Sequence, residues 1–215
     1  MTPKNRGYKK LFLLAYFLLS LQGFSQKKTN IWKAQVALGI NMPSQSGFVT
    51  GFESKTINFP TVRLGVQNMF KRQMGAKLDF GFNRFSNSDA SSLEFKTNYT
   101  RINAQFVYDP TESIPFLPMR MGVVAHAGPG YSFITPLGNF GDNNLGFFNL
   151  MAGTEFHYAL SQRASLYTDI SYILGFAGDF EPPTEGFGAF NGNLLTLTFG
   201  ITFSLSGCQY CPNGY

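Results

Sequence analysis

Apolar and polar residues alternate with a period of two along most of the chain, which predicts β-strands rather than helices. The clearest segment, 195–203, has leucine, phenylalanine or isoleucine at every odd position and threonine or glycine between them. Eight segments follow this pattern, some more regularly than others: 32–41, 61–69, 76–83, 101–108, 119–132, 146–158, 164–174 and 195–203. The pattern therefore predicts an all-β chain of eight strands.

The connections between these segments alternate in length. Long connections at 42–60, 85–98, 133–145 and 175–192 alternate with short ones at 70–73 and 159–163 and an intermediate one at 109–118. Long loops on one side and tight turns on the other are typical of outer-membrane barrels. A soluble β-sandwich also has alternating strands, but the polar face here is rich in Gly, Asn, Gln and Thr and lacks a fringe of Lys and Glu. The membrane barrel is therefore favoured.

Aromatic residues on the apolar face gather at the strand ends. With the first strand starting in the periplasm, one group falls near the periplasmic rim and a second near the opposite rim: Trp32, Phe70, Tyr108, Tyr158 and Phe203, then Phe82, Tyr131, Phe148 and Tyr172. Such rings prefer the two membrane interfaces, and lipid cannot satisfy the edge of an open sheet. We therefore expect a transmembrane, eight-stranded, antiparallel up-and-down β-barrel.

The first 25 residues have the features of a secretory signal peptide. Four basic residues precede an apolar run at 11–21, and small residues stand before Gln26. The run is too short for a membrane-spanning helix, which needs about 20 residues. We expect three parts: a cleaved signal peptide (1–25), an outer-membrane β-barrel (26–205) and a periplasmic C-terminal tail (206–215).

Removal of the signal peptide changes the charge of the chain. The formal net charge is +5, and the first 25 residues carry four positive side chains and no negative ones, so that +5 − 4 = +1. A basic nucleic-acid partner is therefore not expected. Charged residues make up 13% of the chain, about half of the ~25% usual for a soluble domain. A wall covered by outer-membrane lipid or lipopolysaccharide accounts for so little charge.

The lumen is expected to hold a charge network. An eight-stranded barrel is just wide enough for side chains to fill its interior, and buried charges are costly unless they are paired. By alternation, the network contains Arg63, Lys77, Asp79, Arg101, Arg120, Glu155 and Asp169. Counting from the tight turns places Arg63 near Asp79 and Glu155 near Tyr167. Such a network either plugs the barrel or gates a narrow pore.

Catalysis is not expected. His126 and His157 are the only histidines, and alternation turns both of them inward, away from lipid substrates. A nucleophilic group needs a serine within hydrogen-bonding reach of its base, and no serine shares a rim with either histidine on the outer face. The sequence thus predicts no catalytic residues, no metal site and no cofactor.

The loops and the tail carry the remaining chemistry. The loops are rich in phenylalanines that either form a contact surface or pack within their own loops: Phe48, Phe52, Phe59, Phe116, Phe133, Phe140, Phe176, Phe180, Phe187 and Phe190. In the tail, Cys208 and Cys211 are a candidate disulfide in an oxidising compartment. Unpaired thiols, a bridge to a partner and half of a metal site are the alternatives.

Four segments carry a resemblance to a known family: 101–110, 126–131, 152–158 and 166–172, which read RINAQFVYDP, HAGPGY, AGTEFHY and LYTDISY. With the aromatic-ended last strand near Phe203, they resemble the small outer-membrane barrels of the OmpA/OmpX type, particularly those of Bacteroidota. The resemblance covers nearly the whole mature chain and implies a fold, not an activity. The peptidoglycan-binding domain that follows many OmpA-type barrels is not expected, because ten residues remain after Leu205.

These observations favour a non-enzymatic structural or interaction module in the outer membrane of a Gram-negative bacterium. A protein partner would bind the extracellular loops or the C-terminal tail, which makes the chain a candidate accessory subunit of a secretion or uptake complex. The alternative is a small gated pore or a ligand-binding barrel.

Overall fold

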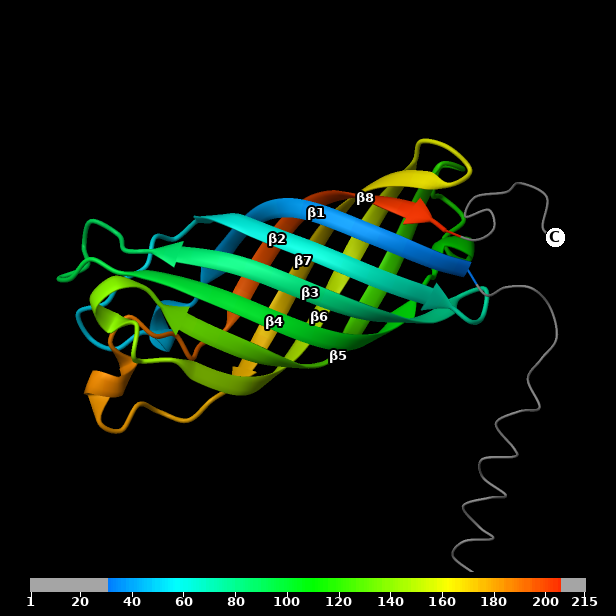
Figure 1. Cartoon of the computed structure of the whole chain (residues 1–215). Coiled ribbons are helices and arrows are strands. Elements are labelled where there is room, and N and C mark those ends of the chain that lie inside the picture. The colour runs from blue at the N-terminus through cyan, green and yellow to red at the C-terminus, as the bar shows by residue number, and fades with distance from the viewer. Residues whose placement is uncertain (1–30, 206–215) are drawn as a thin grey trace, which may run out of the picture.

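The computed structural model describes residues 31–205, which form eight strands joined by loops that contain four short 3-10 helices (Figure 1). The strands are β1 (Ile31–Pro43), β2 (Asn58–Met69), β3 (Met74–Ser86), β4 (Lys96–Tyr108), β5 (Met121–Pro136), β6 (Leu145–Ala159), β7 (Ala164–Phe176) and β8 (Leu194–Ser204). The helices are η2 (Gln45–Gly47), η3 (Thr111–Ser113), η4 (Gly138–Phe140) and η5 (Pro183–Gly186). None of the helices in this part of the chain is long and apolar enough to cross a membrane.

The sheet is a closed barrel in which every strand pairs antiparallel with its neighbours in sequence, and β1 pairs with β8. Ala37 on β1 lies opposite Gly200 on β8, for example, so the first and last strands complete the wall. Closure leaves no free sheet edge, as a structure surrounded by lipid requires. The predicted fold, an eight-stranded antiparallel up-and-down barrel, is confirmed.

The two ends of the barrel differ, as the loop lengths predicted. The loop end carries the connections 44–57, 87–95, 137–144 and 177–193, at the left of Figure 1. The terminal end carries residues 31 and 205 and the connections 70–73, 109–120 and 160–163. Several strands run further toward the loop end than predicted; β5, for example, continues to Pro136. They do so because residues such as Ile134, 1% exposed, pack into an apolar cluster inside the mouth.

The wall is apolar outside and polar inside. Leu38, Leu64 and Phe199 are 50%, 49% and 61% exposed on the outer face, whereas Arg63 and Gln67 are buried in the lumen. On the outer face of the described strands, charged side chains are confined to Arg84 and Lys96, near the loop end. An apolar outer face of this kind is what a bilayer requires and what water disfavours, so the barrel spans a membrane.

Two of the predicted segments lie outside residues 31–205. These are the signal peptide (1–25) and the tail (206–215) with Cys208 and Cys211. Both stay sequence-based predictions.

Candidate functional site: the filled lumen

The centre of the lumen holds a carboxylate between two guanidinium groups. Asp79 on β3 points inward between Arg63 on β2 and Arg101 on β4, because all three occupy inward positions of adjacent strands. Arg63 donates to Asp79 Oδ2 from Nε at 3.2 Å and from Nη2 at 3.0 Å. Arg101 Nη1 donates to Asp79 Oδ1 at 2.5 Å. The predicted neighbourhood of Arg63 and Asp79 is therefore observed.

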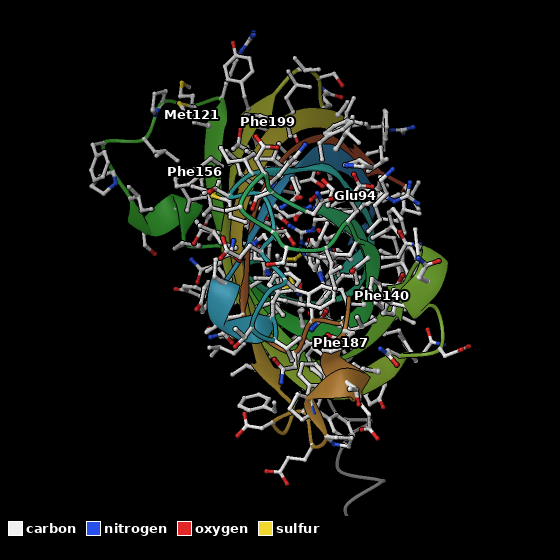
Figure 2. All side chains as sticks on the ribbon, turned by 90° about the vertical axis from the view of Figure 1, so that its left-hand side faces the viewer. Glu94, Met121, Phe140, Phe156, Phe187 and Phe199 are labelled. Carbon is white, nitrogen blue, oxygen red and sulfur yellow. The ribbon has the colours of Figure 1, made fainter. Side chains whose placement is uncertain are left out.

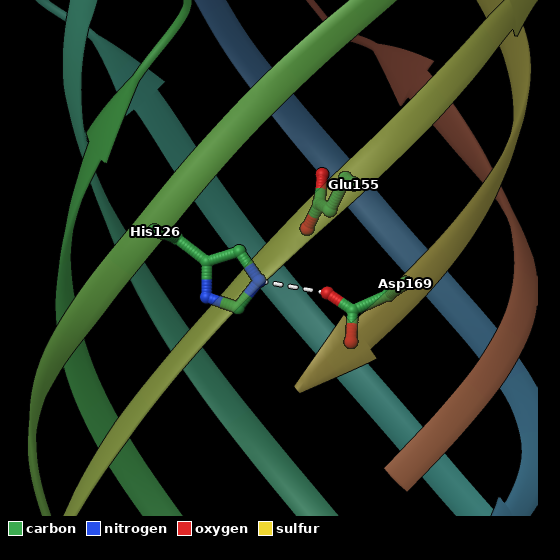
Figure 3. A group of neighbouring side chains, drawn as sticks. All are labelled: His126, Glu155 and Asp169. Atoms are coloured by element: carbon green, nitrogen blue, oxygen red, sulfur yellow. Dashed lines mark hydrogen bonds and ion pairs between the residues drawn. The ribbon is translucent and has the colours of Figure 1, made fainter. Parts of the chain in front are cut away.

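Arg63 also reaches across the lumen to the opposite wall. Its Nη1 forms an ion pair with Asp169 Oδ1 on β7. The same carboxylate accepts a hydrogen bond from Ser171 at 2.5 Å and lies 2.7 Å from His126 Nε2 on β5 (Figure 3). A single arginine thus contacts both β3, the neighbour of β2 in the sheet, and β7, which shares no backbone hydrogen bonds with β2.

A second cluster surrounds Glu155 on β6. Lys77 Nζ on β3 lies 2.6 Å from Glu155 Oε1, and Gln35 Nε2 on β1 donates to Oε2 at 2.9 Å. His157 Nε2 is 2.8 Å from the same Oε2. The His157 ring stacks on Tyr167, with ring centroids 5.3 Å apart. The residues of this cluster come from β1, β3, β6 and β7 and fill the lumen beside the arginine network.

The charges in these two clusters balance. Arg63, Lys77 and Arg101 give +3, and Asp79, Glu155 and Asp169 give −3; each of the six residues is 3% exposed or less. Charges taken out of water lose several kcal/mol of solvation each, and pairing with good geometry offsets that loss. The lumen thus carries a neutral, interlocked ion-pair network.

Three possible metal ligands meet in this network. The ligand atoms of His126, Glu155 and Asp169 lie within 4.8 Å of one another (Figure 3). Both carboxylates, however, already pair with cations, Lys77 on Glu155 and Arg63 on Asp169. Because the network is neutral, an added divalent ion would bring uncompensated positive charge. Ion pairing alone accounts for this arrangement.

The predicted neighbourhood of Glu155 and Tyr167 is also observed, as a diagonal pair on the inward face of β6 and β7. Glu155 lies directly opposite Asp169, and His157 lies directly opposite Tyr167. The turn sets this pairing, because the backbone N–H groups of Leu160 and Ser161 both donate to the Ala164 carbonyl. A shift of the turn centre by one residue would move each partner by two, which preserves the inward face and changes only the pairing.

Arg120 lies outside the network, contrary to the prediction. It precedes β5, which begins at Met121, and its side chain is exposed. Its backbone carbonyl accepts a hydrogen bond from Ala159 N at 2.8 Å at the terminal end. The prediction failed because alternation was extended one residue beyond the start of the strand, where the backbone no longer follows the pleat.

Two network members were not singled out in the sequence: Gln35 and Ser171, which bind the two carboxylates. Both histidines, which alternation turned inward, also join the carboxylates. Strand alternation alone turns Gln35 and Ser171 inward as well, which is the signal that could have found them. The contacts between distant strands have no such signal.

Aromatic side chains fill the mouth at the loop end. Phe190, from the loop before β8, is fully buried between Phe48 and Phe85, with ring centroids 4.9 and 5.0 Å away. Phe52 stacks on Phe187 at 5.2 Å. Figure 2 looks onto this end, with Phe140 and Phe187 at the mouth. We call this group the aromatic cap: Phe48, Phe52, Phe85, Phe95, Tyr99, Phe140, Phe147, Phe180, Phe187 and Phe190.

Hydrogen bonds to backbone carbonyls fasten the cap to β4 and join two of its loops to each other. Thr97 on β4 donates to the Gly188 carbonyl at 2.5 Å, and Asn191 N donates to the Gly47 carbonyl at 3.0 Å. Gly188 has φ +71°, where a side chain would be strained, and a Cβ there would lie 3.0 Å from Phe140.

The phenylalanines assigned to the loops therefore divide into a packed group and an exposed group. Six of them pack within the cap: Phe48, Phe52, Phe140, Phe180, Phe187 and Phe190. Four remain exposed, at 64%, 84%, 47% and 62%: Phe59, Phe116, Phe133 and Phe176. Below the ion pairs, a small apolar cluster of Met69, Val107 and Val124 lies inside the lumen near the terminal end. Ion pairs thus occupy the middle of the lumen, and apolar clusters lie toward both ends, with the buried Lys33 also near the terminal end.

A closed membrane-spanning barrel with a filled lumen is the class of protein that these features define. Among solved structures, the chain is similar to a major outer membrane protein from Thermus thermophilus, with 13% identity and a TM-score of 0.58 over 83% of this chain and 100% of that one. It is also similar to Neisserial surface protein A, with 14% identity and a TM-score of 0.55 over 84% of this chain and 100% of that one. No family model matches the chain, and no curated protein matches its sequence. The fold is that of the small outer-membrane β-barrels.

Proposed function

We propose that the chain is a non-enzymatic outer-membrane barrel that acts as a structural and interaction module, with both termini in the periplasm. The observation that carries this proposal is the filled lumen, in which a neutral ion-pair network lies beneath the aromatic cap. A barrel whose lumen is occupied by paired charges and covered by aromatic rings acts through its outer wall, its loops or its tail. The resemblance to OmpA/OmpX-type barrels of Bacteroidota belongs to the same proposal.

The burial of a serine that lies within hydrogen-bonding distance of a histidine supports a non-enzymatic role. Ser165 Oγ lies 3.1 Å from His157 Nδ1, and His157 Nε2 lies 2.8 Å from Glu155. These distances would suit a nucleophilic group, but Ser165 is fully buried in the lumen. Glu155 is also occupied by Lys77 and Gln35. A substrate would have to displace the network in order to reach this hydroxyl group.

Conductance measurements distinguish the module from the gated pore. We expect the purified chain to give no stepwise current in a planar bilayer, because ions would have to cross both the cap and the paired charges. The Arg63→Ala and Asp79→Ala variants also leave the cap in place, so they too are expected to give no stepwise current. If the wild-type chain gives an open-state current, and either variant changes that current, the result would favour the gated pore.

The interaction surface that we propose is the acidic loop end. Seven acidic residues against three basic ones give 3 − 7 = −4 there: Glu53, Asp89, Glu94, Asp142, Asp179, Glu181 and Glu185, with Lys55, Arg84 and Lys96. Asp179, Glu181 and Glu185 belong to the loop before β8, and all three are exposed. Such a surface suits a basic partner, as expected of an accessory subunit in a larger envelope complex.

Purification from native outer membrane tests the interaction role. We expect the tagged chain to co-purify with a partner in fixed stoichiometry, and the Asp179→Asn, Glu181→Gln, Glu185→Gln triple variant to lose that partner. A chain lacking residues 206–215 tests the tail in the same way. A wild-type chain that elutes alone as a monomer contradicts the interaction role.

A further inference from the structure

A groove of about 660 Å³ runs across the outer wall over β6, β7, β8 and β1. Two rows of outward side chains form its sides, each row following the pairing of adjacent strands. One row contains Phe156, Thr168, Phe199 and Leu38, and the other contains Tyr158, Leu166, Ile201 and Val36. Between them lie Tyr167, Gly200 and Ala37, which point no side chain outward.

The depth of the groove depends on Thr168. Thr168 is small and lies in register between Phe156 and Phe199, two large rings that are 46% and 61% exposed. The result is an apolar channel with tall sides in the part of the wall that faces lipid.

The groove climbs from the terminal end toward the middle of the membrane. Along one side, Tyr158 is one residue from the strand boundary at the terminal end, Leu166 two, Ile201 three and Val36 five. Strands are about 4.8 Å apart, so the path from β6 to β1 is about 14 Å long. That length is close to half of the ~30 Å hydrocarbon core of a bilayer. The groove is therefore long enough to hold much of one acyl chain in the leaflet at the terminal end.

Two exposed arginines lie at the lower end of the groove. Arg120 is held beside the end of β6 by the Ala159 N–H, and Arg163 is held beside the end of β8 by the Ser204 N–H, at 2.8 and 2.7 Å from their carbonyls. Within residues 31–205, neither side chain forms an ion pair or a hydrogen bond. Both are therefore free to bind an anionic group at the membrane interface.

The connection 109–120 projects from the barrel wall beside the lower end of the groove. Figure 2 shows this loop projecting beyond the wall on the flank where Met121, Phe156 and Phe199 lie. Its tip carries Phe116 and Met119, which are 84% and 92% exposed. Since the neighbouring wall faces lipid, a loop that projects sideways at this level meets the headgroup layer, where exposed apolar side chains are stabilised.

We propose that this flank binds one anionic phospholipid, with an acyl chain in the groove and the phosphate at Arg120 and Arg163. The bilayer supplies this occupant wherever the wall faces lipid, and the basic lower end of the groove complements a phosphate. Lipid bound here would fix the orientation of the projecting loop on the membrane surface.

Native mass spectrometry of the folded chain in detergent, titrated with palmitoyl-oleoyl phosphatidylglycerol, tests the proposal. We expect the wild-type chain to bind one lipid. The Thr168→Trp variant, whose groove is filled by the new side chain, is expected to bind that lipid about tenfold more weakly. Ala152→Trp is the matched control, because Ala152 also faces outward on β6 but lies outside the groove. This control variant is expected to bind lipid as the wild-type chain does.

The headgroup site is tested separately from the acyl-chain site. The Arg120→Gln, Arg163→Gln variant is expected to lose about tenfold in affinity for phosphatidylglycerol, since each interfacial arginine contributes a few-fold, and to bind dioleoylglycerol unchanged. Each variant is first shown to be folded by its heat-dependent gel mobility, with Thr168→Phe replacing Thr168→Trp if that variant does not fold. Equal binding by the wild-type and filled-groove chains overturns the proposal. A dimer of the wild-type chain that is lost in the filled-groove variant would also overturn the proposal, because the groove would then hold a second copy of this chain.

Discussion

Replacement of Asp79 by alanine is expected to lower the free energy of unfolding by about 3–5 kcal/mol, the usual loss when one partner of a buried ion pair is removed. Asp79 contacts both Arg63 and Arg101, and Arg101 has no other ionic partner within residues 31–205. Removal of the Asp79 carboxylate therefore leaves the positive charge of Arg101 buried without compensation. Urea unfolding in detergent, followed by the emission of the single tryptophan, Trp32, measures the change.

Two variants make this prediction specific. Glu94→Ala removes an exposed carboxylate that has no ion pair among the described residues, and is expected to change stability by less than about 0.5 kcal/mol. The Asp79→Leu, Arg101→Met double variant removes one charge of each sign and leaves Arg63 paired with Asp169. Because apolar replacements of a buried pair are often neutral, it is expected to recover most of the loss. A loss of less than about 1 kcal/mol in Asp79→Ala would mean that the lumen is well hydrated.

The second large effect is expected at the aromatic cap. Phe190→Ala removes the ring at the centre of the cap, and truncation of a buried phenylalanine costs about 3–5 kcal/mol. Because Phe190 belongs to a loop, the loss is expected as local opening of 177–193 rather than as unfolding of the barrel. Limited digestion of the folded protein with proteinase K measures this opening as new cleavage within the loop.

The control for the cap is Phe176→Ala. Phe176 belongs to the same part of the chain but is 62% exposed on the outer wall. Its replacement is expected to leave the loop as resistant to the protease as in the wild-type chain. Equal cleavage of the wild-type, Phe190→Ala and Phe176→Ala chains would show that the cap does not hold the loop.

Strand alternation predicted which side chains face lipid and which face the lumen, because this alternation depends only on residues that are neighbours in the sequence. The inward positions of Arg63, Asp79 and Arg101 follow from the parity of their strands. The residue directly opposite Glu155 does not follow from the pattern, because one residue in the turn decides it. Arg120 was misplaced because parity ends where the strand ends.

Contacts between distant parts of the chain were beyond any local pattern. The ion pair of Arg63 with Asp169 depends on the curvature of the closed barrel and on the length of the arginine side chain. The packing of Phe190 against Phe48 likewise brings together two loops that lie at opposite ends of the sequence. Composition suggested aromatic loops but not the direction in which their rings turn.

The ion pair between Arg63 and Asp169 also has a consequence for the order of assembly. These residues lie on β2 and β7, which are not neighbours in the sheet, so they meet only when β1 and β8 have paired. Interactions that form after the transition state slow unfolding and leave the rate of folding unchanged. We therefore expect this one ion pair to hold the closed barrel against reopening, without contributing to the speed of the steps that precede closure.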